Sequence, residues 1–153
     1  MRVPQILQFA ETLATLCCAL FAGAALYVNL VEHPARMDCG TQLATTEFAP
    51  SYRRATRLQA FLAIGGSLSA TVVWICGGSV AWLCGAVLFF SVVPFTLIVI
   101  LPTNKRLLEA SLDRTSEQAR ALLVRWGRLH AVRTVVSLAA LVLFLRLMMV
   151  LAK

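Results

Sequence analysis

Four apolar runs, each long enough to cross a lipid bilayer, constrain the fold of this chain most strongly. They cover about residues 6–30, 58–76, 80–101 and 132–151. A spanning helix needs about 20 mostly apolar residues and satisfies its backbone hydrogen bonds internally, because the hydrocarbon core holds no water. The chain is 59% hydrophobic and 14% charged, whereas about a quarter of the residues in soluble domains are charged. We therefore predict an all-α integral membrane protein, a four-transmembrane-helix bundle forming a single domain over residues 1–153.

Basic residues are concentrated in two of the connections between these runs. Residues 32–57 and 102–131, with Arg133 directly after, contain eleven of the fourteen basic residues. Cytoplasmic loops of membrane proteins are enriched in lysine and arginine. We therefore expect both long connections in the cytoplasm and both termini outside, in a bacterial inner membrane. The net charge of +7 does not indicate nucleic acid as a partner, because the basic residues are not interleaved with aromatic ones.

Turn and proline signals predict how the four helices are arranged. The Gly-Gly-Ser sequence at 77–79 predicts a tight turn between antiparallel second and third helices. Pro94 is expected to kink the third span. After Pro102 we expect a short amphipathic continuation over residues 104–112.

The fourth helix is predicted to extend well out of the membrane. The sequence Thr-Ser-Glu-Gln at 115–118 fits a capping box with Thr115 as the N-cap. Apolar residues then follow a helical period into the fourth apolar run. One long helix is therefore expected from about residue 116 to residue 151.

Small and polar residues on the first helix predict its inward face. Glu11, Cys18, Ala22 and Asn29 fall on one side, since eighteen residues make five full turns. An acid within a span normally faces the bundle interior, and small residues let helices approach closely. Gly65 and Gly66 offer a similar surface on the second helix.

Polar residues gather at the ends of the spans on one side of the membrane. An even number of spans brings all of these ends to the same membrane face, whichever way the chain is inserted. Asn29 and His33 are expected to lie one above the other, four residues apart. The full group consists of Asn29, His33, Arg54, Arg57, Asn104, Trp126, His130 and Arg133.

Each member of this group also has a purely structural interpretation. His33 fits a helix C-terminal cap, and Trp126 fits an interfacial anchor. Arg133 fits a partner for a lipid phosphate or for Glu32. The two asparagines fit interhelical hydrogen bonds. Cys39, Tyr52 and the acidic loop residues fit solvated positions.

Four motifs give the chain a resemblance to a known family. In order they are YVNLVEHPAR at 27–36, YRRA at 52–55, LPTNKRL at 101–107 and RWGRLHAVR at 125–133. Together they resemble the membrane domain-of-unknown-function family that includes the fungal anthrone oxygenases. The resemblance implies a four-helix membrane fold. On the fungal branch it implies oxidation of a polyketide anthrone to the anthraquinone by dioxygen, without a cofactor or metal.

The resemblance also implies roles for particular residues. A base with a pKa near physiological pH would remove the acidic C–H proton, which suits histidine, and amide and guanidinium donors would stabilise the developing oxyanion. His130 and His33 are equal candidates for the base, and Trp126 would stack on a flat substrate. The expected catalytic residues are Asn29, His33, Asn104, His130 and Arg133, and the expected substrate-binding residues are Arg36, Tyr52 and Trp126.

Other functions remain open at this stage. A scaffold, accessory subunit or lipid-binding protein would also present a basic membrane face. A haem held by His33 and His130, or a zinc or copper site completed by Glu32, Asp38 or Cys39, are weaker alternatives. The lipid bilayer is the expected partner, together with a small aromatic substrate, and homo-oligomerisation is left open.

Overall fold

The computed structural model describes residues 3–151 and contains helices and short connections over that range. Four helical stretches are long and apolar enough to cross a membrane, at Gln5–Asp38, Thr41–Ile75, Val80–Leu107 and Glu117–Met149. The predicted four-helix membrane fold is therefore confirmed. Two π-helical turns interrupt the α-helices. The elements are α1 (Val3–Tyr27), η1 (Val28–Glu32), α2 (His33–Asp38), α3 (Thr41–Ile75), α4 (Val80–Phe90), α5 (Val92–Phe95), η2 (Thr96–Ile100), α6 (Leu101–Leu107) and α7 (Glu117–Leu151).

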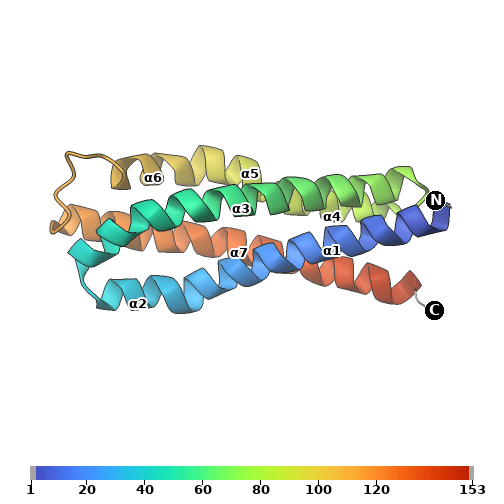
Figure 1. Ribbon diagram of the computed structural model, residues 1–153, viewed down its shortest axis with the longest axis horizontal. Helices are drawn as coiled ribbons and strands as arrows, with labels where there is room; N and C mark the ends of the chain where they lie inside the picture. Colours follow the sequence, from blue (N-terminus) through green and yellow to red (C-terminus); the bar gives the residue numbers. More distant parts are fainter. Residues whose placement is uncertain (1–2, 152–153) are drawn as a thin grey trace.

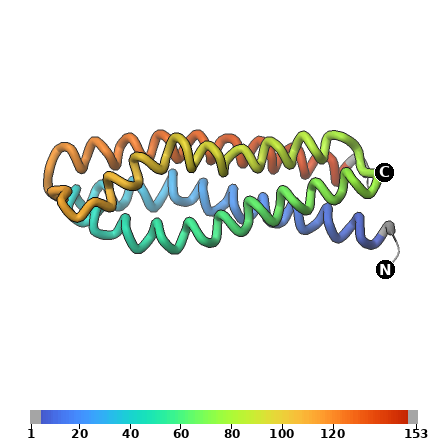
Figure 2. The backbone as a smooth tube through the Cα atoms, turned by 90° about the horizontal axis from the view of Figure 1, so that it is seen from above, coloured from blue at the N-terminus to red at the C-terminus, as the bar shows by residue number. Residues whose placement is uncertain are grey.

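The helices form an elongated antiparallel bundle. Both ends of the chain lie at one end of it, beside the turn between α3 and α4, and the connections from α2 to α3 and from α6 to α7 lie at the other (Figures 1 and 2). The predicted Gly-Gly-Ser turn is present, and Gly77 has φ +97°, a conformation that favours glycine. We call the end opposite the termini the basic end. Arg2 and Lys153, two of the three basic residues predicted on the other side of the membrane, lie outside the described residues.

The connection at residues 32–57 is almost entirely helical. α2 ends at Asp38 and α3 begins at Thr41, so only two residues separate them, and Gly40 has φ +90°. Pro50 lies inside α3. The helix that contains the second predicted span therefore begins well before residue 58, because α3 continues beyond its apolar part.

The third span is irregular on both sides of Pro94, where a kink was predicted. The helix is interrupted at Ser91, and the π turn η2 follows Pro94 and precedes Pro102. The predicted continuation to residue 112 is too long, since α6 ends at Leu107. Its last turn then gives way to irregular structure before α7.

The start of α7 differs by one residue from the predicted capping box. The Ser116 hydroxyl accepts the Ala119 backbone N–H at 3.2 Å, so Ser116 is the N-cap in place of Thr115. Thr115 instead donates both its hydroxyl, at 2.7 Å, and its backbone N–H, at 2.9 Å, to Asp113 Oδ1. These two hydrogen bonds lower the pKa of the Asp113 carboxyl. The aspartate therefore takes Thr115 into the preceding turn, which leaves Ser116 to cap the helix.

The predicted inward face of α1 is largely confirmed. Glu11, Cys18 and Ala22 are buried, while Asn29 is half-buried. On α3 it is Gly66 that makes the close approach. A Cβ at this position would lie 2.8 Å from the Phe89 ring and 2.9 Å from the Cys17 Cβ. The small-residue row thus lets α1, α3 and α4 pack tightly, as expected where lipid supplies no hydrophobic drive between helices.

Candidate functional site

A small polar cavity lies within the basic end of the bundle. Its volume is about 40 Å³. Beside it is an apolar cluster of Ala44, Phe48, Ile100, Leu107, Leu122, Leu123 and Trp126, separate from the larger core toward the termini. The cavity is lined by residues from every membrane-crossing stretch, namely Val28, Glu32, Arg36, Phe48, Ser51, Tyr52, Ala55, Thr56, Gln59, Ile100, Asn104, Trp126, His130 and Arg133.

His130 lines this cavity and is held by Asn29. The distance from His130 Nδ1 to Asn29 Oδ1 is 2.6 Å. The Asn29 amide nitrogen donates to the Gly127 carbonyl at 3.2 Å, and the Thr134 hydroxyl donates to Asn29 Oδ1 at 2.6 Å. These contacts fix the orientation of the amide, because its NH₂ faces a carbonyl and its oxygen faces a hydroxyl.

This orientation determines the tautomer of the His130 imidazole. Asn29 Oδ1 can only accept, so His130 Nδ1 must carry the proton. The neutral ring then has its lone pair on Nε2, for which no hydrogen-bond partner is found among the described residues. His130 is therefore arranged as a base or acceptor at the cavity, with Asn29 as the residue that orients it.

His33 occupies a different position from His130 and does not line the cavity. Its ring packs against Trp126 with the centroids 5.2 Å apart, and Trp126 in turn packs against His130 at 4.8 Å. A Cβ on Gly127 would lie 2.5 Å from His33 Nε2, so the glycine makes room for this ring. Of the two histidines that the sequence left equivalent, only His130 therefore lines the cavity.

Aromatic rings form one wall of the cavity. The Phe48 ring meets the Trp126 ring edge-on at 5.4 Å and lies parallel to the Tyr52 ring at 5.7 Å. Tyr52 is half-buried and so is not simply solvated. Offset and edge-on pairs of this kind hold rings in fixed orientations, which suits a flat ligand.

Arg133 is a buried cation whose partners carry no charge. Its guanidinium donates to Gln59 Oε1 and lies over the Phe21 ring at 5.1 Å. Its side chain forms no ion pair with a carboxylate in the described part of the chain, and its Nε has no hydrogen-bond partner there. Of the two structural alternatives for Arg133, a lipid phosphate or Glu32, the pairing with Glu32 is not found. An uncompensated buried charge is costly, and it makes this end of the cavity attractive to an anion or a developing oxyanion.

Glu32 instead belongs to a network around Arg36. Arg36 forms an ion pair with Glu32, and its Nε lies 2.8 Å from a Glu47 carboxylate oxygen. The Ser51 hydroxyl donates to Glu32 at 3.0 Å. The Arg36 guanidinium also lies over the Trp126 ring, 5.9 Å from the centroid. This network joins α2 to α3 and closes the cavity at the basic end.

The two π turns flank the site and precede prolines at the same offset. The His33 N–H bonds to Val28 O, and the Leu101 N–H bonds to Thr96 O, each five residues back. The following residues, Pro34 and Pro102, have no N–H to donate. In an α-helix the Asn29 and Leu97 carbonyls would accept from the His33 and Leu101 N–H groups, which here bond one residue further back. π turns of this kind occur frequently at functional sites.

The structure brings most of the predicted site residues together, with different degrees of contact. Six of them line the cavity, whereas Asn29 and His33 support residues that do. Asn104 is 1% exposed and its Oδ1 has no partner among the described residues. Arg54 and Arg57 in α3 do not join the site, since both are exposed. The six lining residues are Arg36, Tyr52, Asn104, Trp126, His130 and Arg133.

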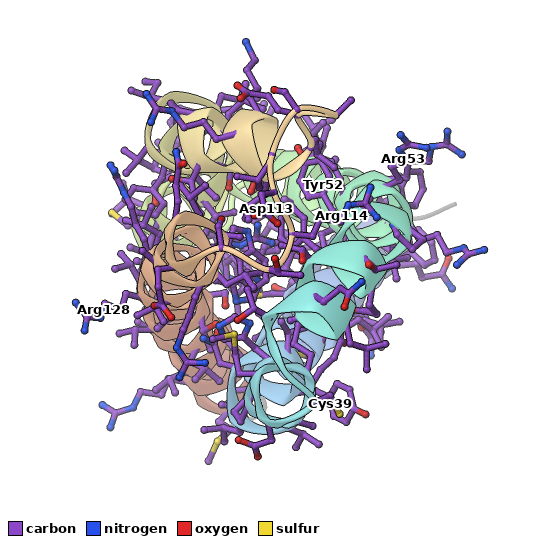
Figure 3. All side chains as sticks on the ribbon, turned by 90° about the vertical axis from the view of Figure 1, so that its left-hand side faces the viewer. Cys39, Tyr52, Arg53, Asp113, Arg114 and Arg128 are labelled. Carbon is purple, nitrogen blue, oxygen red and sulfur yellow. The ribbon has the colours of Figure 1, made fainter. Side chains whose placement is uncertain are left out.

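Figure 3 looks along the bundle onto the basic end. Arg53 and Arg128 project outward, while Tyr52 and Asp113 lie over the bundle. Cys39 is exposed, as expected. Sequence reasoning missed Gln59 and Thr134. The available signal was their position in the sequence, since Thr134 follows His130 by one helical turn and Gln59 lies close after Arg57. However, polar residues of this kind are frequent in membrane helices.

The described residues contain no group of three or more His, Cys, Asp or Glu side chains placed to hold a metal ion. The Trp126 indole packs on both imidazoles.

Comparison with known proteins places the chain in a family. Residues 48–143 match the sequence model of the anthrone oxygenase family. The anthrone oxygenase tpcL of Aspergillus fumigatus is 30% identical over 146 residues, which cover 89% of this chain and 91% of the relative. The anthrone oxygenase gedH of Aspergillus terreus is 30% identical over 128 residues, or 76% and 84% of the two chains. No solved structure matches the chain. These matches confirm the resemblance seen in the motifs, and the chain belongs to the anthrone oxygenase family.

Proposed function

We propose that this membrane protein oxidises an anthrone, or a closely related aromatic substrate, with dioxygen and without a cofactor. The observation that carries the proposal is the pairing of His130 with Asn29. It leaves Nε2 as the proton-free nitrogen of a ring that lines the same cavity as Arg133. A base and a buried cation at one cavity suit a reaction that begins by creating a carbanion and delocalising its charge onto an oxygen.

The chemistry balances with the substrate and dioxygen alone. His130 Nε2 takes one proton from the reactive methylene carbon, and the resulting enolate oxygen is stabilised by Arg133, with Asn104 as a second donor. The carbanion is oxidised by dioxygen, which is reduced and forms a C–O bond to give the hydroperoxide anion. The imidazolium returns its proton to that anion.

Loss of water then completes the reaction. His130 removes the second methylene proton, the electron pair of that C–H bond forms the new carbonyl, and the O–O bond breaks. The departing hydroxide takes the proton as water. Overall, one anthrone and one O₂ give one anthraquinone and one H₂O. The Trp126 and Tyr52 rings would hold the flat substrate during these steps.

Oxygen uptake by purified protein tests the proposal. Wild type, supplied with an anthrone and a chelator, should consume oxygen, and the product formed under ¹⁸O₂ should contain one labelled carbonyl oxygen. His130→Ala should lose uptake and partly regain it with added imidazole, because the free base replaces the missing one. His33→Ala should retain more activity than His130→Ala. No uptake by wild type above the uncatalysed background would overturn the proposal in favour of a non-enzymatic accessory or lipid-binding role.

We also propose that the basic end faces the cytoplasm, in a bacterial inner membrane. The positive charges of this end support the first part, whereas the relatives are fungal and do not bear on the second. Cys39 is exposed in the turn between α2 and α3, and Cys76 lies at the opposite end. An impermeant maleimide should therefore label Cys39 in inside-out vesicles and not in intact cells. The reverse result would invert the orientation.

A further inference from the structure

A second chamber adjoins the polar cavity and is mostly apolar. It has a volume of about 100 Å³ and lies between α3 and the α5–η2 segment. Most of its lining is aliphatic or aromatic. Three of its lining residues, Thr56, Gln59 and Arg133, also line the polar cavity. The two spaces therefore meet at these side chains.

The open side of this chamber faces the lipid. Among its lining residues, Ala60 and Leu97 are exposed, Leu97 to 58%. Their neighbours Phe61 and Ile98 are exposed to 74% and 73%. Such large apolar side chains on helices long enough to cross a membrane are expected to contact lipid chains. The opening lies at the start of the apolar part of α3, just after the exposed Arg57, and thus near the boundary between headgroups and acyl chains.

The junction between the two spaces is closed by a hydrogen bond. Arg133, only 9% exposed, donates to Gln59 there, and its Nε has no partner among the described residues. A ligand oxygen could take the place of the Gln59 oxygen at the same guanidinium.

Size also connects the two spaces. Pockets for drug-sized ligands usually have volumes of about 300–1,000 Å³, so a tricyclic molecule does not fit a cavity of 40 Å³. A ligand with its reactive edge among the polar residues would have to extend its apolar body into the neighbouring chamber. One space is polar and the other apolar, as such a molecule requires, and because their volumes of about 40 and 100 Å³ are together still small, the side chains between them must move to admit it.

We infer that a flat apolar ligand bearing an acidic or carbonyl oxygen reaches the polar cavity sideways from the bilayer, between α3 and η2. On this route the ligand oxygen displaces Gln59 from Arg133 and the two spaces become one. The inference deepens the proposed function, because it names the class of substrate and its path. The path itself is testable without turnover.

Chemical labelling of the junction from the lipid side tests the route. In Gln59→Cys, a lipid-soluble maleimide should modify Cys at position 59, quantified by mass spectrometry of the peptide, at least tenfold faster than a charged maleimide of similar size. Adding Ala60→Phe should slow the lipid-soluble reagent about tenfold by filling the opening. Ala139→Phe is the matched control, since Ala139 is equally an exposed alanine on a membrane helix but lines neither space. It should leave the rate unchanged.

Each outcome bears on a different statement. Equal labelling by the charged reagent, or no effect of Ala60→Phe, would overturn the lateral route and indicate access from the aqueous basic end. Labelling as expected without oxygen uptake by wild type would leave the route standing and remove the oxygenase function. A loss of folding in Ala60→Phe would show as altered elution in gel filtration, and Ala60→Leu then provides the smaller obstruction.

Discussion

Replacing Asn29 by Ala should disturb both the stability and the tautomer of the site. The change removes the acceptor of the His130 Nδ1–H and the donor to the Gly127 carbonyl. The Thr134 hydroxyl loses little, because it can turn to the His130 carbonyl 3.1 Å away. An orphaned buried polar group costs about 1–3 kcal/mol, whereas interhelical hydrogen bonds in membranes average about 0.6 kcal/mol. We expect the free energy of unfolding to fall by about 1–3 kcal/mol.

The effect on the His130 tautomer is the sharper expectation. One neutral hydrogen bond contributes about 1 kcal/mol, and about 1.4 kcal/mol corresponds to a tenfold change in an equilibrium. Without Asn29, the ratio of the Nδ1–H tautomer to the other tautomer should therefore fall about fivefold, and kcat should fall with that population, by up to about fivefold. Asn29→Asp keeps the acceptor and should preserve the Nδ1–H tautomer.

Nitrogen NMR of the imidazoles measures this directly. The chain has two histidines, so a His33→Gln variant assigns the spectrum. Wild type should show a protonated Nδ1 and an unprotonated Nε2 for His130, and Asn29→Ala should show exchange between the two forms. If Asn29→Ala left both the spectrum and kcat within twofold of wild type, Asn29 would not orient His130 and the assigned base would lose its main support.

Four further substitutions test the helix packing, the His33 contact and the start of α7. Gly66→Ala should destabilise the bundle by about 1–3 kcal/mol through overpacking. Gly65 has open space at its Cβ position, so Gly65→Ala should be neutral or stabilising by up to about 1 kcal/mol. Thermal unfolding in detergent compares the two variants, and equal effects would contradict the close approach at Gly66. Gly127→Ala should displace the His33 ring, because the new Cβ would lie 2.5 Å from His33 Nε2. The change should appear in the His33 NMR signals, and unaltered signals would exclude the predicted contact. Ser116→Ala should lower the free energy of unfolding by about 1 kcal/mol through loss of the N-cap, as measured by denaturant titration. An unchanged free energy of unfolding would indicate that another residue caps α7.

The sequence predicted the membrane fold well because lipid imposes simple requirements on it. Apolar length and turn residues alone define four helices and their antiparallel neighbours. The apolar runs did not show how far a helix continues outside them. α3 begins at Thr41, before the predicted span at 58–76, because its first part buries Ala44 and Phe48 beside the site.

The site was predicted as a location but not as a set of contacts. The parity of the spans requires the polar motifs to meet at one end, and the structure brings them there. The partners could not be inferred, since they depend on how the helices are rotated. Arg133 thus contacts Gln59 and not Glu32, and Glu32 pairs with Arg36 within the same helical stretch.

The prolines show why periodicity alone gave an incomplete account of the site. Pro34 and Pro102 each follow a residue whose N–H reaches five residues back, so a carbonyl in each preceding turn loses its usual donor. In a membrane such a carbonyl is tolerated only where protein or a polar cavity surrounds it. The residues concerned are Asn29, which holds His130, and Leu97, which lines the chamber beside Arg133. Both irregularities therefore lie where the proposed substrate would pass or react, and an alanine in place of either proline would supply an N–H able to bond to the Asn29 or Leu97 carbonyl five residues back.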